Sequence, residues 1–297
     1  MAMWGLVRRS LVALHVAAAV LGMQSRAQAG ELRVETRNGV RTAIVLPAER
    51  GPAPTIIVLH GAFSSAAWTA RHYGFAEAAA ARGFAAVFPQ GLRGCWNDGR
   101  NPFPWRANDV AFLKVLAGEL IAERIAEPSR IYLAGVSNGG MMAMRMLCEA
   151  SDLFAGAGTV IANMPAAIGM KCQPSRPVPV VMFNGSADTW VPYRGGGVGP
   201  LNLGGFVWGT QQTADFMAHA NGCSAGPVPS DVSIDSMSVT RFAWTRCDRR
   251  ANVTLYRVNG GRHEVYGAMN FLPARAGGNR SQIVSAAETI LATFAKE

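Results

Sequence analysis

The fold of this chain is decided by the stretch Ile131-Tyr132-Leu133-Ala134-Gly135-Val136-Ser137-Asn138-Gly139-Gly140. Its apolar first half, rich in branched and aromatic residues, predicts a buried strand, and this strand ends in the pattern Gly-x-Ser-x-Gly. Helix-forming residues follow directly from Met141 to Leu147, so we expect the chain to turn sharply from strand to helix at Ser137. Such a turn, a nucleophile elbow, exposes a serine hydroxyl above a sheet. It also directs backbone N–H groups toward an oxygen that becomes negative when a carbonyl is attacked.

The two glycines of the pattern, Gly135 and Gly139, have a mechanical reason. Side chains at these positions would collide with the neighbouring strand and helix, and the turn itself holds the serine in a strained backbone conformation. The same five-residue pattern also occurs by chance in unrelated loops. The strand before it and the helix after it therefore carry the functional interpretation.

Strands and helices alternate on both sides of the elbow. Buried strands are predicted over residues 55–59, 84–89, 154–162, 178–183 and 253–258, and helices over residues 66–82, 109–125 and 281–294. Strands that alternate with helices pair in parallel through right-handed crossovers, which predicts an α/β fold whose mostly parallel sheet is covered by helices on both faces. A leading hairpin over residues 32–47, turning at Asn38-Gly39, is expected to add an antiparallel edge. We expect one domain over residues 30–297.

Three segments do not follow this alternation. Residues 92–107 and 193–208 form long loops just after strand ends, where the ligand crevice of an open α/β sheet lies, so we expect both to serve a site. Trp96 and Trp190 are candidates for an aromatic wall that binds substrate, with packing of the loop or the core as the alternative. Residues 225–238 are polar and indicate a linker.

The expected base for Ser137 is His263. A serine hydroxyl is a weak nucleophile at neutral pH and needs a base, which a carboxylate must orient. In folds with such an elbow the chain order is Ser, then Asp or Glu, then His. Of the five histidines, only His263 lies in a loop after a late strand, where Gly260 and Gly261 let the chain present it. A lone loop histidine is more often an ordinary surface residue, but the elbow serine has no other candidate base. His60 lies before the serine in the chain and is expected to be structural.

The expected acid is Asp188. It follows a buried strand that enters a Gly-containing turn, which brings its carboxylate to the same sheet edge as Ser137. The competing carboxylates lie in less suitable places, namely at the far end of the helix after the serine, within a helix, in the polar stretch, or beside His263: Asp152, Asp215, Asp231, Asp235 and Glu264.

The oxyanion hole needs two backbone donors. Asn138, the residue after the nucleophile, is expected to supply one N–H group. The loop that follows the strand at residues 55–59 is expected to supply the other, from either Ala62 or Phe63.

Seven segments, in this order and at these spacings, resemble the secreted polyhydroxybutyrate depolymerase and feruloyl esterase family of α/β-hydrolases: LHGAFSS, FPQG, CWND, NDVAFL, AGVSNGGMMAMRMLCEASDLFAG, NGSADTWVPY and NGGRH. The resemblance covers most of the chain between Thr55 and His263. It implies the α/β-hydrolase fold and the triad Ser137, Asp188 and His263. It also implies an extracellular carboxylic ester hydrolase without a metal or an organic cofactor.

We therefore expect a serine esterase that forms an acyl-enzyme on polyhydroxyalkanoate-type esters or on feruloyl or acetyl esters of polysaccharides. Two alternatives stay open. A serine peptidase or acyltransferase on the same fold would differ in its preference for amide over ester substrates. A non-catalytic module that binds polymer would fail to react with a fluorophosphonate probe.

The first 29 residues predict a secretory signal peptide. Arg8 and Arg9 precede an apolar run over residues 11–21, and Ala27-Gln28-Ala29 supplies a small-residue cleavage site. The apolar run is too short to span a bilayer of about 30 Å. We therefore expect a secreted or periplasmic protein, exported by the general route or by the twin-arginine route.

The net charge and the cysteines bear on nucleic-acid binding, metal binding and disulfide pairing. The formal net charge is +9, but the basic residues are scattered without the interleaved aromatics of a nucleic-acid module, which favours solubility as their role. The five cysteines would meet an oxidising compartment after export, and their spacing does not match zinc-ligand patterns. Several pairings fit the sequence, and we expect the local pairs Cys148 with Cys172 and Cys223 with Cys247, which leaves Cys95 free.

Overall fold

The computed structural model describes residues 30–37, 39–100, 107–232, 238–268 and 285–296. The predicted signal peptide, residue 38 of the hairpin turn, residues 101–106 of the first long loop and the first four residues of the last predicted helix lie outside the described residues.

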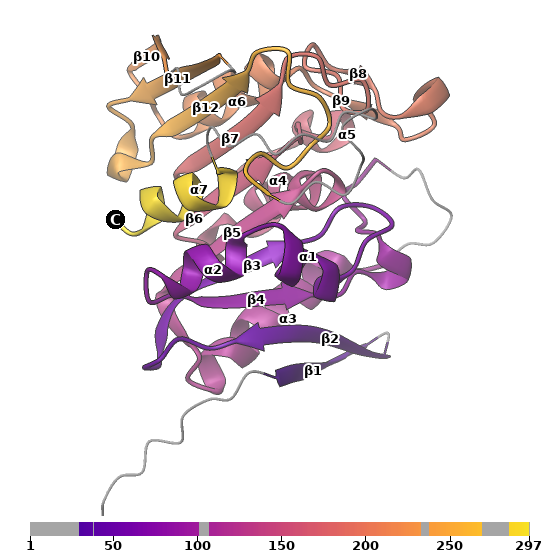
Figure 1. Cartoon of the computed structure of the whole chain (residues 1–297), viewed down its shortest axis with the longest axis vertical. Helices are drawn as coiled ribbons and strands as arrows, with labels where there is room; N and C mark the ends of the chain where they lie inside the picture. The colour runs from indigo at the N-terminus through magenta and orange to yellow at the C-terminus, as the bar shows by residue number, and fades with distance from the viewer. Residues whose placement is uncertain (1–29, 38, 101–106, 233–237, 269–284, 297) are drawn as a thin grey trace, which may run out of the picture.

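The chain builds one ten-stranded sheet in the order β1-β2-β4-β3-β5-β6-β7-β12-β11-β10 (Figure 1). The strands are β1 Gly30–Thr36, β2 Gly39–Leu46, β3 Ala53–Leu59, β4 Ala85–Pro89, β5 Ala126–Val136, β6 Gly156–Val160, β7 Val180–Gly185, β10 Ala225–Asp231, β11 Val239–Thr245 and β12 Val253–Val258. The run from β4 to β12 pairs in parallel, and β1 pairs with β2 in the predicted hairpin. The expected α/β-hydrolase architecture is thereby confirmed. A small separate sheet joins β8 Gly196–Gly197 to β9 Phe206–Val207.

Helices cover both faces of the large sheet. The α-helices are α1 Ala66–His72, α2 Phe75–Ala80, α3 Asp109–Ala122, α4 Asn138–Ala150, α5 Ala166–Gly169, α6 Thr210–Ala220 and α7 Ala286–Phe294, and the short 3-10 helices are η1 Leu92–Gly94, η2 Ser151–Leu153, η3 Pro200–Asn202 and η4 Asp248–Arg250. One core cluster lies between the sheet and α1, α2 and α7, and two others lie under α3, α4 and α6. Because β4, β6 and β7 are buried along their whole length, their sequences lack the alternation of a half-exposed strand.

Two elements near the N-terminus refine the sequence prediction. The single helix predicted over residues 66–82 is wrong, because the chain breaks into α1 and α2 at Gly74, whose φ of 76° is left-handed. The start of α1 is capped by Ser65, whose Oγ accepts the backbone N–H of Trp68 at 3.1 Å. Likewise, the side chain of Asn108 accepts the N–H of Ala111 and caps α3.

The far edge of the sheet corrects a second prediction. The segment expected to be a linker, residues 225–238, contains the exposed strand β10, which pairs antiparallel with β11. Pro227 and Pro229 within β10 are compatible only with an edge position, because proline has no N–H to donate to a ladder. The sheet therefore ends in antiparallel strands on both sides, where the sequence predicted only one such edge.

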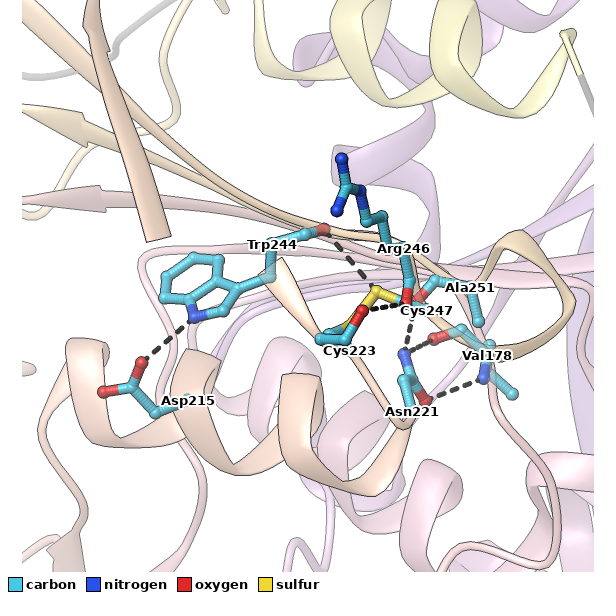
Figure 2. The surroundings of a disulfide bond; sticks show 9 residues. Val178, Asp215, Asn221, Cys223, Trp244, Arg246, Cys247 and Ala251 are labelled. Atoms are coloured by element: carbon cyan, nitrogen blue, oxygen red, sulfur yellow. Dashed lines mark hydrogen bonds between the residues drawn. A yellow bond between two sulfur atoms is a disulfide. The ribbon is translucent and has the colours of Figure 1, made fainter. Parts of the chain in front are cut away.

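Two disulfides are present, with the expected pairing. Cys148 of α4 is bonded to Cys172, and Cys223 after α6 is bonded to Cys247 after β11, while the buried Cys95 is free. Figure 2 shows the second disulfide beside Asn221, whose side chain donates to the carbonyls of Val178 and Ala251. Among the described helices, none has the length and hydropathy needed to cross a bilayer.

Candidate active site

Ser137 stands at the junction of β5 and α4 in a strained conformation. Its φ of 53° is rare for a residue with a side chain, and its backbone N–H donates to the carbonyl of Val160 on the neighbouring strand at 2.9 Å. The flanking glycines permit the turn. A Cβ at Gly135 would lie 2.2 Å from the carbonyl oxygen of Gly139, and a Cβ at Gly139 would lie 2.4 Å from the carbonyl oxygen of His60.

The structure brings three side chains from distant segments into one chain of hydrogen bonds. His263 Nε2 lies 3.0 Å from Ser137 Oγ, and His263 Nδ1 lies 2.7 Å from Asp188 Oδ2. These three residues follow the carboxyl ends of β5, β12 and β7, which meet at one edge of the sheet. The arrangement satisfies the geometric test for an activated nucleophile, in which the nucleophile contacts a base and the base contacts an orienting group.

Asp188 is buried and fully engaged. Its Oδ1 accepts the backbone N–H groups of Trp190 at 2.8 Å and Val191 at 2.9 Å, while its Oδ2 faces His263. The same loop is held from below by Asn163, whose side-chain amide donates to the carbonyl of Pro192 at 3.1 Å. The carboxylate is therefore fixed in direction as well as in position.

The loop that carries His263 packs directly against the loop that carries Asp188. The N–H of Gly260 donates to Ser186 Oγ at 2.8 Å, and the N–H of Ala187 donates to the carbonyl of Gly261 at 2.9 Å. A Cβ at Gly185 would lie 2.2 Å from that same carbonyl oxygen. Because the two loops approach each other so closely, glycines precede both His263 (Gly260 and Gly261) and Asp188 (Gly185).

The loop after β3 lies against the elbow, as an oxyanion hole requires. A Cβ at Gly61 would contact the Cβ of Ser137 at 3.7 Å. Burial raises the pKa of the Cys95 thiol, and the backbone amide of Phe63 beside it lowers the same pKa. Ala62 and Phe63 of this loop both remain candidates for the second oxyanion donor, alongside Asn138 at the start of α4.

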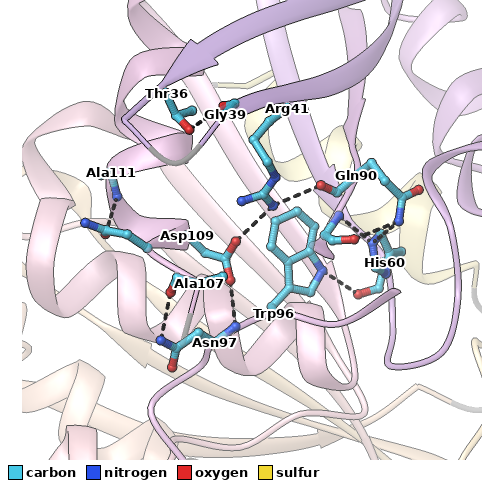
Figure 3. Close-up of polar contacts among 12 residues, drawn as sticks. Thr36, Gly39, Arg41, His60, Gln90, Trp96, Asn97, Ala107, Asp109 and Ala111 are labelled. Carbon is cyan, nitrogen blue, oxygen red and sulfur yellow. Dashed lines mark hydrogen bonds and ion pairs between the residues drawn. The ribbon is translucent and has the colours of Figure 1, made fainter. Parts of the chain in front are cut away.

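His60 is structural, as predicted from its place before the serine (Figure 3). Its Nε2 accepts the N–H of Gly91 at 2.9 Å, so Nδ1 carries the proton and donates to the carbonyl of Gly61 at 2.7 Å. Burial lowers the pKa of His60 below its ordinary value. A neutral imidazole thus ties the oxyanion loop to the loop after β4.

The two tryptophans proposed as an aromatic wall, Trp96 and Trp190, differ in their exposure to solvent. Trp96 is buried, and its Nε1 donates to the carbonyl of His60 at 2.9 Å (Figure 3). Its ring also stacks on Phe112. Its expected contact with substrate is therefore wrong, because the ring packs the loop onto the core. Trp190 is 52% exposed and its ring lies 6.4 Å from the ring of His263, so it remains a candidate.

Sequence reasoning missed one buried group at this site. The carboxylate of Asp98, in the loop after β4, accepts a hydrogen bond from the side chain of Asn138 at 2.6 Å. Two signals pointed to this residue: it lies in a loop predicted to serve the site, and it ends the CWND segment that carries the family resemblance. Neither signal indicates that its carboxylate contacts Asn138.

No family model matches the chain. It is 28% identical over 275 residues to "Putative esterase NocK" from Nocardia uniformis subsp. tsuyamanensis, which covers 87% of this chain and 78% of that protein. It is 30% identical over 219 residues to feruloyl esterase B from Piromyces equi, which covers 71% of this chain; the match spans only 39% of that longer protein.

Solved structures show the same fold at low sequence identity. An acetyl xylan esterase from Aspergillus awamori aligns with a TM-score of 0.57 and 14% identity, over 79% of this chain and 94% of that one. An S-formylglutathione hydrolase from Staphylococcus aureus aligns with a TM-score of 0.54 and 12% identity, over 90% of this chain and 96% of that one.

Proposed function

We propose that this chain, a serine esterase with the α/β-hydrolase fold, cleaves carboxylic esters of polymers or of their oligomers outside the cytoplasm. The single observation that carries the proposal is the continuous hydrogen-bond chain from Ser137 Oγ through His263 to Asp188. A hydroxyl, an imidazole and a carboxylate in this order supply the nucleophile, the base and the orienting group of acyl transfer.

The proposed reaction proceeds in two halves. Ser137 Oγ attacks the ester carbonyl while His263 Nε2 takes its proton, and Asp188 stabilises the imidazolium that forms. The backbone N–H groups of Asn138 and of either Ala62 or Phe63 bind the oxyanion of the tetrahedral intermediate. His263 then protonates the leaving alcohol, which leaves the acyl group on Ser137. In the second half, water attacks the acyl-enzyme while His263 takes its proton, and His263 returns that proton to Ser137 Oγ as the acid is released.

The substrate class is inferred from an apolar rim on the loops beyond the carboxyl ends of β3, β4, β6 and β7. We define this apolar rim by seven side chains: Phe63, Leu92, Met170, Trp190, Leu201, Leu203 and Phe206. They are seven of the ten large apolar side chains that are exposed within the described residues. Exposed apolar side chains that gather on a surface mark an interaction site, and apolar side chains on loops at the same sheet edge as Ser137 suit an ester presented by a large, partly apolar substrate.

Feruloyl or acetyl esters of polysaccharides and polyhydroxyalkanoate-type esters are the proposed natural substrates. The similarity to feruloyl esterase B supports the first of these, and the apolar rim suits both. The two disulfides support export, because such bonds persist in oxidising compartments. We infer that the signal peptide predicted over residues 1–29 directs this export.

The test is hydrolysis of p-nitrophenyl acetate and butyrate by the mature protein and its Ser137→Ala variant. We expect kcat to fall by at least about 10³-fold while the melting temperature stays within a few degrees. Ser224→Ala, which changes an exposed serine outside the site, is the matched control and should keep full activity. Equal turnover by Ser137→Ala and the wild type would refute the mechanism.

A substrate panel then identifies the ester. Feruloylated oligosaccharide, acetylated xylan and polyhydroxybutyrate film are offered to the same purified protein, and product release is compared with that of Ser137→Ala. Comparison of each ester with the corresponding amide tests the peptidase alternative, because a peptidase would cleave the amide at a similar rate.

A further inference from the structure

Asp98 is a buried carboxylate that the proposed reaction does not use. It lies in the loop after β4 with 1% of its surface exposed. Its Oδ2 accepts a hydrogen bond from Asn138 Nδ2 at 2.6 Å. Asn138 is the first residue of α4, and its backbone N–H is the proposed oxyanion donor. Asp98 thus contacts the side chain of a residue whose backbone N–H group is proposed to bind the oxyanion.

The side chain of Asn138 has no remaining freedom. Its Oδ1 accepts the N–H of Trp96 at 2.7 Å, and its Nδ2 donates to the carbonyl of Trp96 at 3.0 Å as well as to Asp98. Both ends of the amide are therefore anchored in the loop after β4. A residue held in this way also holds the direction of its own backbone N–H group.

Arg100 compensates the charge of Asp98. Its Nη2 and Nε lie 2.6 and 2.9 Å from Asp98 Oδ2, and its backbone N–H donates to Oδ1 at 3.0 Å. Both side chains are nearly inaccessible to solvent. Burying two charges costs much of what their attraction contributes, so an ion pair of this kind is weak evidence for a role in stability alone.

The same guanidinium reaches the loop that carries three of the seven side chains of the apolar rim. Arg100 Nη1 donates to the carbonyl of Gly204 at 2.7 Å. At Gly205, whose φ is 76°, a Cβ would lie 3.0 Å from the Cβ of Arg100. Leu201, Leu203 and Phe206 of the apolar rim flank this contact in sequence. One carboxylate thus connects the start of α4 to the substrate-facing loop over residues 194–209.

We propose that Asp98 is a positioning residue of the oxyanion hole, which fixes the Asn138 backbone N–H through its side chain and couples it, through Arg100, to the loop over residues 194–209. The inference rests on the proposed esterase function. An oxyanion donor contributes about 10²- to 10³-fold to kcat, and a displacement of about 1 Å costs about 10²-fold. Loss of the anchor should therefore lower kcat by about 10- to 100-fold and leave KM within about twofold.

The test compares Asp98→Ala with Asp109→Ala. Asp109 is the matched control because it is an equally buried carboxylate of the same region, paired with Arg41 and accepting the N–H of Asn97, yet it does not contact Asn138. We expect both variants to lower the melting temperature and only Asp98→Ala to lower kcat on p-nitrophenyl acetate. An equal loss of kcat in both variants, or none in Asp98→Ala, would overturn the proposal.

Two further variants keep the test decisive if Asp98→Ala does not fold. Asn138→Ala retains the backbone N–H and leaves the ion pair of Asp98 with Arg100 intact. We expect Asn138→Ala to lower kcat at least as much as Asp98→Asn does, because the asparagine introduced at position 98 still offers an oxygen to the Asn138 side chain. The double variant Asp98→Asn/Asn138→Ala should lose no more kcat than Asn138→Ala alone, because the two side chains act as one unit. Additive losses would contradict the coupling.

A readout without substrate separates this inference from the proposed function. Hydrogen exchange of the segment 137–142 should be faster in Asp98→Ala than in the wild type and unchanged in Asp109→Ala. This result would support the anchor even if the wild type hydrolysed no ester. Unchanged exchange in Asp98→Ala would refute the anchor even if the wild type were an active esterase.

Discussion

Asp188 binds His263 with one carboxylate oxygen and its own loop with the other: Oδ2 lies 2.7 Å from His263 Nδ1, and Oδ1 accepts two backbone N–H groups. The two oxygens are therefore not interchangeable. Only the oxygen that is free of the loop can face the imidazole.

This asymmetry predicts the effect of Asp188→Asn. The loop N–H groups need an acceptor, so the amide oxygen of the asparagine should face Trp190 and Val191, which turns its NH₂ group toward His263 Nδ1. An imidazole that must accept at Nδ1 carries its proton on Nε2 and cannot act as a base toward Ser137. We expect kcat on p-nitrophenyl acetate to fall by about 10³- to 10⁴-fold, with the melting temperature as the control for folding. A tenfold loss or less would show that the carboxylate does not set the tautomer.

The buried His60 predicts a pH dependence of stability. Because burial lowers the pKa of His60 in the folded state, the unfolded chain binds more protons than the folded one below the ordinary pKa of 6.5. The free energy of unfolding should therefore fall as the pH is lowered from 7.5 to 5.5. In His60→Gln this contribution is absent, so urea denaturation at the two pH values should give a smaller difference than in the wild type. His219→Gln in α6 controls for the substitution itself. An unchanged difference in His60→Gln would mean that this histidine does not carry the effect.

The crowding at the elbow predicts that Gly139→Ala is poorly tolerated. Its Cβ would lie 2.4 Å from two backbone carbonyl oxygens of β3 and the following residue, and overpacking of this kind costs about 1–3 kcal/mol or more. We expect a lower melting temperature and loss of ester hydrolysis. Gly118→Ala is the matched control, because the space around Gly118 in α3 is open and alanine stabilises a helix by about 0.5–1 kcal/mol relative to glycine.

The tryptophans predict opposite phenotypes. Trp190→Ala should raise KM for esters with a long or aromatic acyl group more than for p-nitrophenyl acetate, since its ring is exposed beside His263. Trp96→Phe should lower the melting temperature and leave the ratio of KM values unchanged, because it loses only the hydrogen bond to His60 and some packing. Steady-state kinetics on the two esters, with thermal unfolding of each variant, checks both outcomes. Equal shifts in that KM ratio would remove Trp190 from the substrate site.

Local sequence determined much of the fold. The elbow was readable because three constraints coincide within ten residues: a buried strand, two glycines that allow close backbone contact, and a helix start. The order along the chain then singled out Asp188 and His263, since each follows a buried strand and sits among glycines. The structure brings both to Ser137, over sequence separations of 51 and 126 residues.

What sequence could not supply depends on tertiary contacts. β10 has the composition of a linker and becomes a strand only because β11 lies beside it. The sequence makes Trp96 a candidate for substrate binding or for packing of its loop, and only its neighbours in space, which bury it, decide between the two. Asp98 could not be recognised as a partner of Asn138, because the two lie 40 positions apart in sequence and are separated by a helix and a strand whose packing decides the contact.

The composition of the two outer strands has a consequence for behaviour at high concentration. Pro227 and Pro229 remove two backbone N–H donors from β10, and β1 presents Glu31, Arg33 and Glu35 at the opposite edge of the sheet. Neither margin is a good template for adding a strand from a second molecule, because proline and charge both oppose such pairing. A wide sheet with unprotected edges would favour amyloid-like association of newly made chains while they fold, and the composition of these two edge strands opposes it.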